Sequence, residues 1–267
     1  MRPGSQAREG WPRQLGTRRQ RLLDAAWWGA AWWGFVGGAA LLIGALLGIY
    51  LPVSSRVIGL VMAFGAGVLI SAVAFELAEE AYQRSGGTAV VLGLLAGAGT
   101  FFIGDWFIDR AGGHRRKSPN GPQPGAGPMA LVLGALLDGI PESAAIGVSL
   151  LGNAGVGLPV VAAVFMSNIP ESMSASAGLK KTGRSTRYVL GLWTAVLAAS
   201  TLAAALGYLL LAGADPSVTA VIQSFAAGAI LTMLADTMVP EAVEHAGAWV
   251  GLLTALGFVA AFLLSMA

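Results

Sequence analysis

The sequence predicts an all-α polytopic membrane protein with eight transmembrane helices. Hydrophobic residues make up 55% of the 267 residues and charged residues only 11%, a balance that excludes an ordinary soluble globular domain. The apolar residues fall into runs that are each close to the ~20 residues needed to cross ~30 Å of hydrocarbon. The 38 glycines allow helix backbones to approach closely in lipid, where helices gain nothing from hydrophobic burial against each other.

The N-terminal residues 1–24 are polar and basic, and we expect them to form a disordered tail. A single transmembrane domain, residues 25–267, follows. Its first run, 25–50, opens with four tryptophans, which collect at the membrane–water boundary. Thr17-Arg18-Arg19 has some likeness to a twin-arginine export signal. No small-residue cleavage site follows it, so we favour a first membrane anchor with a basic flank.

Seven further runs complete the predicted set of spans. They are residues 56–82, 88–109, 128–151, 156–180, 187–213, 217–243 and 247–266. The connection 110–127 joins a basic cluster to a Pro/Gly-rich stretch and is predicted to be a flexible loop. Basic residues gather in this loop and in the connection after the fifth span. The positive-inside rule therefore places both connections on the cytoplasmic side of a cell inner membrane. With eight spans the basic N-terminal tail then lies outside, against the same rule; we follow the two loops because they agree with each other.

Two stretches of the chain are similar to each other. Residues 64–81 match 225–242 at six of eighteen positions, and the same offset of 161 pairs Gly86 with Gly247. Three spans per repeat reverse its direction in the membrane. Spans 1–3 and 6–8 would then be inverted repeats around spans 4 and 5, a 3+2+3 arrangement. Transporters use such repeats and bind their substrate between them.

A tetrapeptide also recurs inside two apolar runs, as Ile140-Pro141-Glu142-Ser143 and as Ile169-Pro170-Glu171-Ser172. A carboxylate at the middle of a bilayer costs roughly 2.5–3.5 kcal/mol on insertion scales. Two such carboxylates at mid-depth therefore need a partner that lowers this cost. An antiparallel pair of helices would allow the two side chains to converge.

Further polar residues share the helix faces of the two glutamates. Asp138 lies four residues before Glu142, and Ser167 lies four residues before Glu171. Asn168 adds an amide. The two prolines each lack an N–H, which frees one main-chain carbonyl in each helix. Together these groups form a negatively charged set of oxygen donors that suits a divalent cation. The predicted metal ligands are Glu142, Glu171, Asp138, Asn168 and Ser167.

Two alternatives remain for these residues. Protonation also lowers the cost of a buried carboxylate, so a proton relay is the nearest competitor to a metal site. Pro followed by Glu is in addition a usual start of a helix, with a polar residue before it as the cap.

The segments Asp138–Ser143 and Ser167–Ser172 resemble the paired signature of the ZIP (Zrt/Irt-like) family of divalent metal transporters. The Phe-x-x-Gly repeats and Val239-Pro240-Glu241-Ala242 are similar to its GufA-like bacterial branch, and the resemblance runs from about residue 30 onward. It implies eight helices, a metal site between spans 4 and 5, and a homodimer. It also implies transport of zinc, or of iron, manganese or cadmium, towards the cytoplasm. The ion is then the substrate, and no organic cofactor is expected.

The chain departs from this family pattern at three of the predicted ligands. Family members usually have His where this chain has Asp138, His or Gln where it has Ser167, and an acidic residue where it has Asn168. We therefore expect one main metal site with oxygen donors. Glu76 and Asp236, near the ends of their spans, are candidates for the ion pathway, and His245 receives no role.

Other functions fit the sequence less well. A metal-dependent enzyme would need His ligands at mid-depth, and both histidines lie outside the predicted spans, so we predict no enzymatic activity. No Walker motif indicates direct drive by ATP. The net charge of +2 gives no reason to expect nucleic acid as a partner; the expected partners are the lipid bilayer and metal ions. A proton-coupled carrier of another solute and a non-transporting membrane receptor remain as alternatives.

Overall fold

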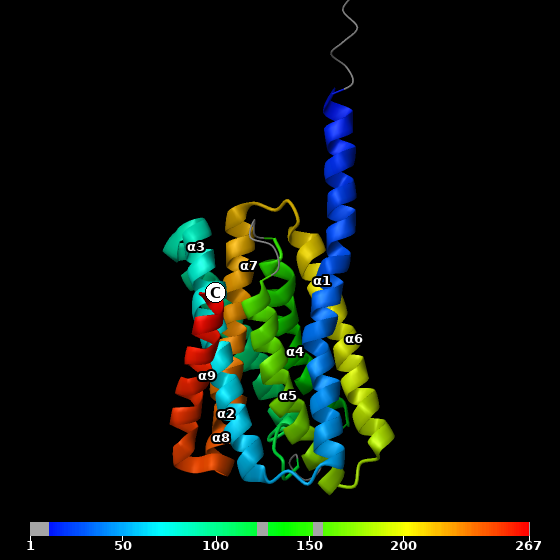
Figure 1. The fold of residues 1–267 in the computed structure, drawn as a ribbon, viewed down its shortest axis with the longest axis vertical. Coiled ribbons are helices and arrows are strands. Elements are labelled where there is room, and N and C mark those ends of the chain that lie inside the picture. Colours follow the sequence, from blue (N-terminus) through cyan, green and yellow to red (C-terminus); the bar gives the residue numbers. More distant parts are fainter. Residues whose placement is uncertain (1–10, 122–127, 152–156, 267) are drawn as a thin grey trace, which may run out of the picture.

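The computed structural model describes residues 11–121, 128–151 and 157–266, and all regular structure in these ranges is helical (Figure 1). The α-helices are α1 (Trp11–Tyr50), α2 (Ser55–Ser71), α3 (Glu80–Ile108), α4 (Pro128–Ser149), α5 (Leu158–Lys181), α6 (Thr186–Leu211), α7 (Pro216–Met233), α8 (Val239–Ala246) and α9 (Val250–Ser265). Short π-helical or 3₁₀ segments join several of them: η1 (Ala72–Glu79), η2 (Asp109–Gly113), η3 (Leu234–Met238) and η4 (Gly247–Trp249).

Five helical ranges are long and apolar enough to cross a membrane: 27–50, 55–113, 129–149, 186–211 and 216–265. Large apolar side chains cover their outer surfaces, as expected of helices that face lipid. Examples are Leu92, Leu95, Phe102, Leu202, Leu210 and Leu263. The all-helical polytopic class predicted from composition is therefore supported by the structure.

The first helix begins earlier than the sequence predicts. α1 starts at Trp11 and extends well beyond the other helices at its N-terminal end (Figure 1). Residues 11–24, which we expected to be disordered, are helical. Arg, Gln and Leu dominate this stretch, and all three are strong helix formers. Residues 1–10 of the predicted tail lie outside the described part of the chain.

Two of the apolar ranges are too long for one span. The range 55–113 contains 59 residues, which would form a straight helix of roughly 90 Å, about three times the hydrocarbon thickness. The chain changes direction inside it at Gly86, where φ is 74°, and inside 216–265 at Gly247, where φ is 59°. Glycine adopts positive φ without the clash that a Cβ causes.

These two breaks follow the sequence repeat. Gly86 and Gly247 are 161 residues apart, which is the offset between the similar stretches 64–81 and 225–242. A π-helical segment also precedes each break, η1 before Gly86 and η3 before Gly247. The two halves therefore share local backbone irregularities as well as residues.

Small residues set the packing of the bundle. α1 packs along α5 and α6, α3 along α7, and α2 along α9, while α4 contacts α6 and α7. A Cβ added at Gly97 would collide with the carbonyl of Phe225, and one at Gly228 with the carbonyl of Leu94. The backbones of α3 and α7 therefore approach more closely than a larger residue would permit.

α5 differs from the other long helices. It has 24 residues but is not among the five apolar ranges, because it carries Asn168, Glu171, several serines and two lysines. These residues are nevertheless mostly buried, since α1, α2 and α6 all contact α5. α5 and α4 supply the polar interior of the bundle.

Candidate metal site

All five predicted ligands lie in the protein interior. Asp138 and Glu142 come from α4, and Ser167, Asn168 and Glu171 come from α5; none of them is more than 4% exposed. Both helices continue through their internal prolines. Asp138 of α4 and Glu171 of α5 lie close enough together to contact the same ammonium group, that of Lys117, at 3.4 Å and 3.1 Å. The structure therefore brings the two motifs together between α4 and α5.

Two basic side chains, which the sequence did not predict here, lie among these acids. Lys117 places its Nζ 3.4 Å from Asp138 Oδ2 and 3.1 Å from Glu171 Oε2. Arg116 donates to both oxygens of Asp138, at 3.2 Å from Nε and 3.0 Å from Nη2. Both basic residues are less than 8% exposed. An ammonium group thus bridges carboxylates of α4 and α5 at the predicted cation site.

Arg116 also joins the site to α3. Its Nη2 is 2.6 Å from Asp105 Oδ1, and its Nη1 is 3.7 Å from Asp109 Oδ1. A Cβ at Gly134 of α4 would collide with the Arg116 side chain, so the glycine provides the space for it. Arg116 is therefore shared among three acids and neutralises Asp138 only in part.

The segment 114–121 that carries these cations is packed into the protein, in contrast to the flexible loop that we predicted for 110–127. The Ser174 hydroxyl donates to the carbonyl of Lys117, and Gly178 lies against the Ser118 carbonyl. Arg115 has φ 60°, a left-handed conformation that costs an L-residue roughly 1–2 kcal/mol. Residues 122–127 of the predicted loop lie outside the described part of the chain.

Glu142 is the acid that these cations leave without a partner. Its side chain is buried, and its Oε1 has no hydrogen-bond partner among residues 11–121, 128–151 and 157–266. It is in no ion pair within those ranges. A buried unpaired charge costs several kcal/mol, so the site is short of one positive charge or one proton.

The remaining ligand candidates are held by their helices. Asn168 donates its amide N–H to the Gly37 carbonyl of α1 at 3.1 Å, and the Ser167 hydroxyl donates to the Val164 carbonyl at 3.0 Å. These bonds use the Ser167 hydroxyl hydrogen and one of the two Asn168 amide hydrogens, and they leave both side-chain oxygens with lone pairs. Both residues can therefore accept a cation without losing their anchoring bonds.

Lys117 is a charged group in this site at neutral pH. Burial lowers the pKa of Lys117, but attraction to Asp138 and Glu171 more than reverses this, so that its pKa lies above the ordinary lysine value. The Lys117 ammonium is therefore a covalently attached cation between two of the predicted ligands, Asp138 and Glu171.

Space beside these groups is small but sufficient for an ion. A cavity of about 20 Å³ is lined by Asp138, Glu171, Lys117 and Trp193, among others. A single water needs roughly 10–15 Å³ by the same measure. Trp193 donates from its ring N–H to the Ser176 hydroxyl at 2.8 Å and closes this side of the site.

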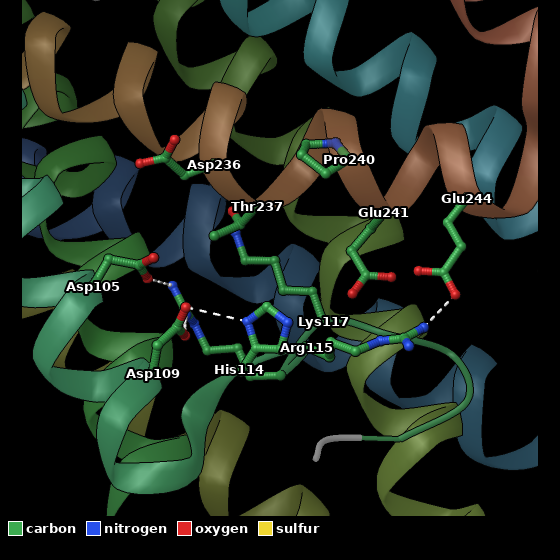
Figure 2. Close-up of a pocket in the computed structure, with 11 residues that line it drawn as sticks. Asp105, Asp109, His114, Arg115, Lys117, Asp236, Thr237, Pro240, Glu241 and Glu244 are labelled. Atoms are coloured by element: carbon green, nitrogen blue, oxygen red, sulfur yellow. Dashed lines mark hydrogen bonds and ion pairs between the residues drawn. The ribbon is translucent and has the colours of Figure 1, made fainter.

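A larger cavity of about 210 Å³ lies beside segment 114–121 and is lined in part by Lys117 (Figure 2). Its acidic lining residues are Asp105, Asp109, Asp236, Glu241 and Glu244, and its basic ones are His114, Arg115, Arg116 and Lys117. Asp236, a predicted pathway residue, therefore lines a cavity that reaches Lys117. Glu76, the other candidate, lines a separate cavity of about 340 Å³ with Glu79 and Glu80.

Arg116 and Lys117 were missed because loop cations are expected to be hydrated. The one available signal was an excess of acids in the membrane, with a cluster of cations close before Asp138 in the sequence. His245, which received no role, lies in the interior beside Glu241.

Comparison with known proteins gives one relative. No protein-family model matches the chain. A protein of Arabidopsis thaliana named "Putative zinc transporter At3g08650" is 28% identical over 211 residues, which cover 78% of this chain and 33% of the relative. The chain thus spans about a third of the length of that protein. The apolar helices of the chain and its similarity to this relative together indicate that the chain is a multi-pass membrane protein.

Proposed function

We propose that this protein transports divalent metal ions across a membrane through the site between α4 and α5. The observation that carries the proposal is the charge at this site. Asp138, Glu142 and Glu171 are buried together, and one ammonium group bridges two of them; within the described ranges Glu142 forms no ion pair, and its Oε1 has no hydrogen bond. A divalent ion in place of Lys117 adds the positive charge that Glu142 needs.

The proposed exchange follows from these contacts. An incoming ion enters the acidic cavity and displaces the Lys117 ammonium from Asp138 and Glu171. Glu142 and Glu171 then bind the ion, with Asp138, Asn168 and Ser167 as further oxygen donors. Arg116 remains between Asp138 and Asp105 and neutralises part of the negative charge that the ion does not. When the ion leaves, Lys117 returns and keeps the empty site neutral enough to stay buried.

The proposed substrate is zinc, with iron, manganese and cadmium as further ions that accept oxygen ligands. The name of the Arabidopsis relative supports zinc. The motifs of α4 and α5 support membership of the ZIP family and its GufA-like branch. With these we propose a homodimer in the cell inner membrane that moves ions towards the cytoplasm, without enzymatic activity and without an organic cofactor.

We further propose eight spans in a 3+2+3 arrangement of inverted repeats. The breaks at Gly86 and Gly247 support it, because they divide the two longest apolar ranges into two spans each. α5 becomes the eighth span, shielded from lipid by α1, α2 and α6. The two repeats would then move against the α4–α5 pair during transport.

Zinc flux into liposomes tests the proposal. Purified protein is reconstituted, and uptake is followed with a zinc-sensitive dye. We expect Glu142→Gln and Glu171→Gln each to reduce uptake at least tenfold, whereas Arg187→Gln, an exposed change away from the site and its cavities, leaves it unchanged. Normal uptake in both site variants would remove α4 and α5 from the pathway. Proton flux without metal flux would favour the proton-coupled carrier, and binding without any flux would favour the receptor.

A further inference from the structure

A second cluster of metal-binding side chains lies on α8, outside the site between α4 and α5. Glu241 and His245 are four residues apart and share one face of this helix, which follows Pro240 and ends at Gly247. His245 Nε2 is 3.4 Å from Glu241 Oε2. With a carboxylate oxygen of Glu244, these ligand atoms all lie within 4.8 Å of one another.

One ligand separation already fits a tetrahedral metal centre. Metal–ligand bonds to His nitrogen and carboxylate oxygen are about 2.0–2.2 Å long, which puts neighbouring ligand atoms of a tetrahedron about 3.4 Å apart. The Glu241–His245 pair already has this separation. Only Glu244, which is exposed and can change its rotamer, has to move to complete the set.

Two buried ligand atoms of this cluster have no hydrogen-bond partner. The side chains of His245 and Glu241 are only 6% and 8% exposed, and neither His245 Nε2 nor Glu241 Oε2 is hydrogen-bonded within the part of the chain that the structure describes. Leaving such groups unpaired costs about 1–3 kcal/mol each. A cation bound between them would satisfy both at once, whereas packing alone accounts for neither.

The cluster is accessible to an ion. Glu241 and Glu244 line the 210 Å³ cavity, and both project from α8 on the side where Arg115 lies (Figure 2). The other side of His245 is closed by α2, where a Cβ at Gly59 would be 3.0 Å from the His245 Cβ. α2 therefore packs closely against the base of the His245 side chain, while the carboxylates of Glu241 and Glu244 face the cavity.

Arg115 neutralises Glu244 when no ion is bound. The two side chains form an ion pair across the cavity mouth (Figure 2). Both groups are partly exposed, so the pair is screened by water and is weak. A divalent ion can therefore replace Arg115 at Glu244 at little cost.

We propose that Glu241, Glu244 and His245 form a second binding site for a divalent transition-metal ion, at the mouth of the acidic cavity. Its mixed nitrogen and oxygen donors favour Zn²⁺, Co²⁺ or Fe²⁺ over Mg²⁺ and Ca²⁺, which prefer oxygen alone. The α4–α5 site has only oxygen donors, so the two sites differ in chemistry. Binding at α8 goes beyond the proposed function, because it requires no transport.

Zinc titration of the full-length protein in detergent tests this site. The background variant is Glu142→Gln/Glu171→Gln, in which the α4–α5 site is disabled. Calorimetry is expected to show one zinc ion still bound, and a further His245→Gln change to weaken that binding at least tenfold. His114→Gln is the matched control, because His114 lines the same cavity and is paired with Asp109. Its zinc affinity should remain that of the background.

Two further measurements distinguish the loss of a metal ligand from misfolding of the variant. Glu244 is exposed, so Glu244→Gln leaves the interior intact and should also weaken binding at least tenfold. X-ray absorption of bound Co²⁺ should show a nitrogen ligand that is lost in His245→Gln. Absence of zinc binding in the background variant, or equal affinity with and without His245, would overturn the proposal. Failure of zinc flux in the wild type would contradict the proposed transport function and leave this second site standing.

Discussion

Replacing Lys117 by methionine should make the α4–α5 site bind metal more tightly. Methionine keeps the length and apolar stem of lysine but removes the ammonium group that lies 3.4 Å from Asp138 and 3.1 Å from Glu171. In the native protein an incoming ion has to displace this group. In the variant Asp138 and Glu171 no longer contact an ammonium group, so an ion can bind them without breaking an existing ion pair.

The size of the effect follows from the two ion pairs. At an effective dielectric constant of ~20, charges at these separations attract by about 5 kcal/mol per pair. Part of this is offset by the cost of burying the ammonium, and removing one partner of a buried ion pair has a net cost of about 3–5 kcal/mol. Since ~1.4 kcal/mol corresponds to tenfold in affinity, a cost of about 3–5 kcal/mol corresponds to zinc binding roughly 100- to 3,000-fold more tightly. Without metal the variant should melt at a lower temperature.

Calorimetric zinc titration of detergent-purified protein measures this effect. Lys181→Met is the matched control, because Lys181 is exposed and, among the residues that the structure describes, donates only to Asn120. In a Glu171→Gln background the gain should shrink, since one of the two ion pairs is already absent. Equal or weaker zinc affinity in Lys117→Met would refute the idea that this ammonium occupies the metal site.

Three further outcomes are expected. Gly178→Val should push segment 114–121 outward, because a Cβ at this position collides with the Ser118 carbonyl. Mass spectrometry should then detect faster amine labelling of Lys117. The control is Gly191→Ala, in which the added methyl group meets no neighbouring atom. Trp193→Phe should lose about 1 kcal/mol of stability with the hydrogen bond to Ser176, seen as a lower Tm, and an unchanged Tm would show that this bond contributes nothing. Finally, the pKa of Lys117 is raised on folding, so its stabilisation is complete below its unfolded pKa of about 10.4 and disappears as pH rises through the raised value. The Tm difference between wild type and Lys117→Met should therefore be constant up to about pH 10 and shrink at higher pH; a difference that shrinks already near pH 8 would contradict the raised pKa.

The sequence predicts the helices well where hydropathy alone determines them. The predicted spans 128–151 and 187–213 agree with α4 and α6 to within two residues. The burial of Asp138, Glu142 and Glu171 could also be predicted, because their neighbours in the sequence are apolar. The inverted repeat, the ion and the direction of transport stay predictions.

The partners of the acids could not be predicted, because they depend on the path of the chain in three dimensions. Lys117 is separated from Glu171 by most of α4 and α5, and a lysine next to a Pro/Gly-rich stretch normally faces water. Similarly, His245 is buried only because α8 ends at Gly247 and α2 packs over it. The helix over residues 11–24 was not predicted for a different reason. The polar and basic composition of this stretch indicates a disordered tail, although many of its residues have a favourable helix propensity.

The composition of α5 bears on how the protein is assembled. A helix with an amide, a carboxylate and four serines at its centre would partition poorly into lipid by itself. In the finished bundle α1, α2 and α6 contact it, and α1 and α2 precede it in the chain. These earlier helices would have to be inserted in the bilayer already, so that α5 can pack against them as it leaves the ribosome. The residues that suit α5 to an ion thus make it dependent on its neighbours during biogenesis, and weakening the α1–α5 contact would reduce the yield of inserted protein before it altered any property of the mature one.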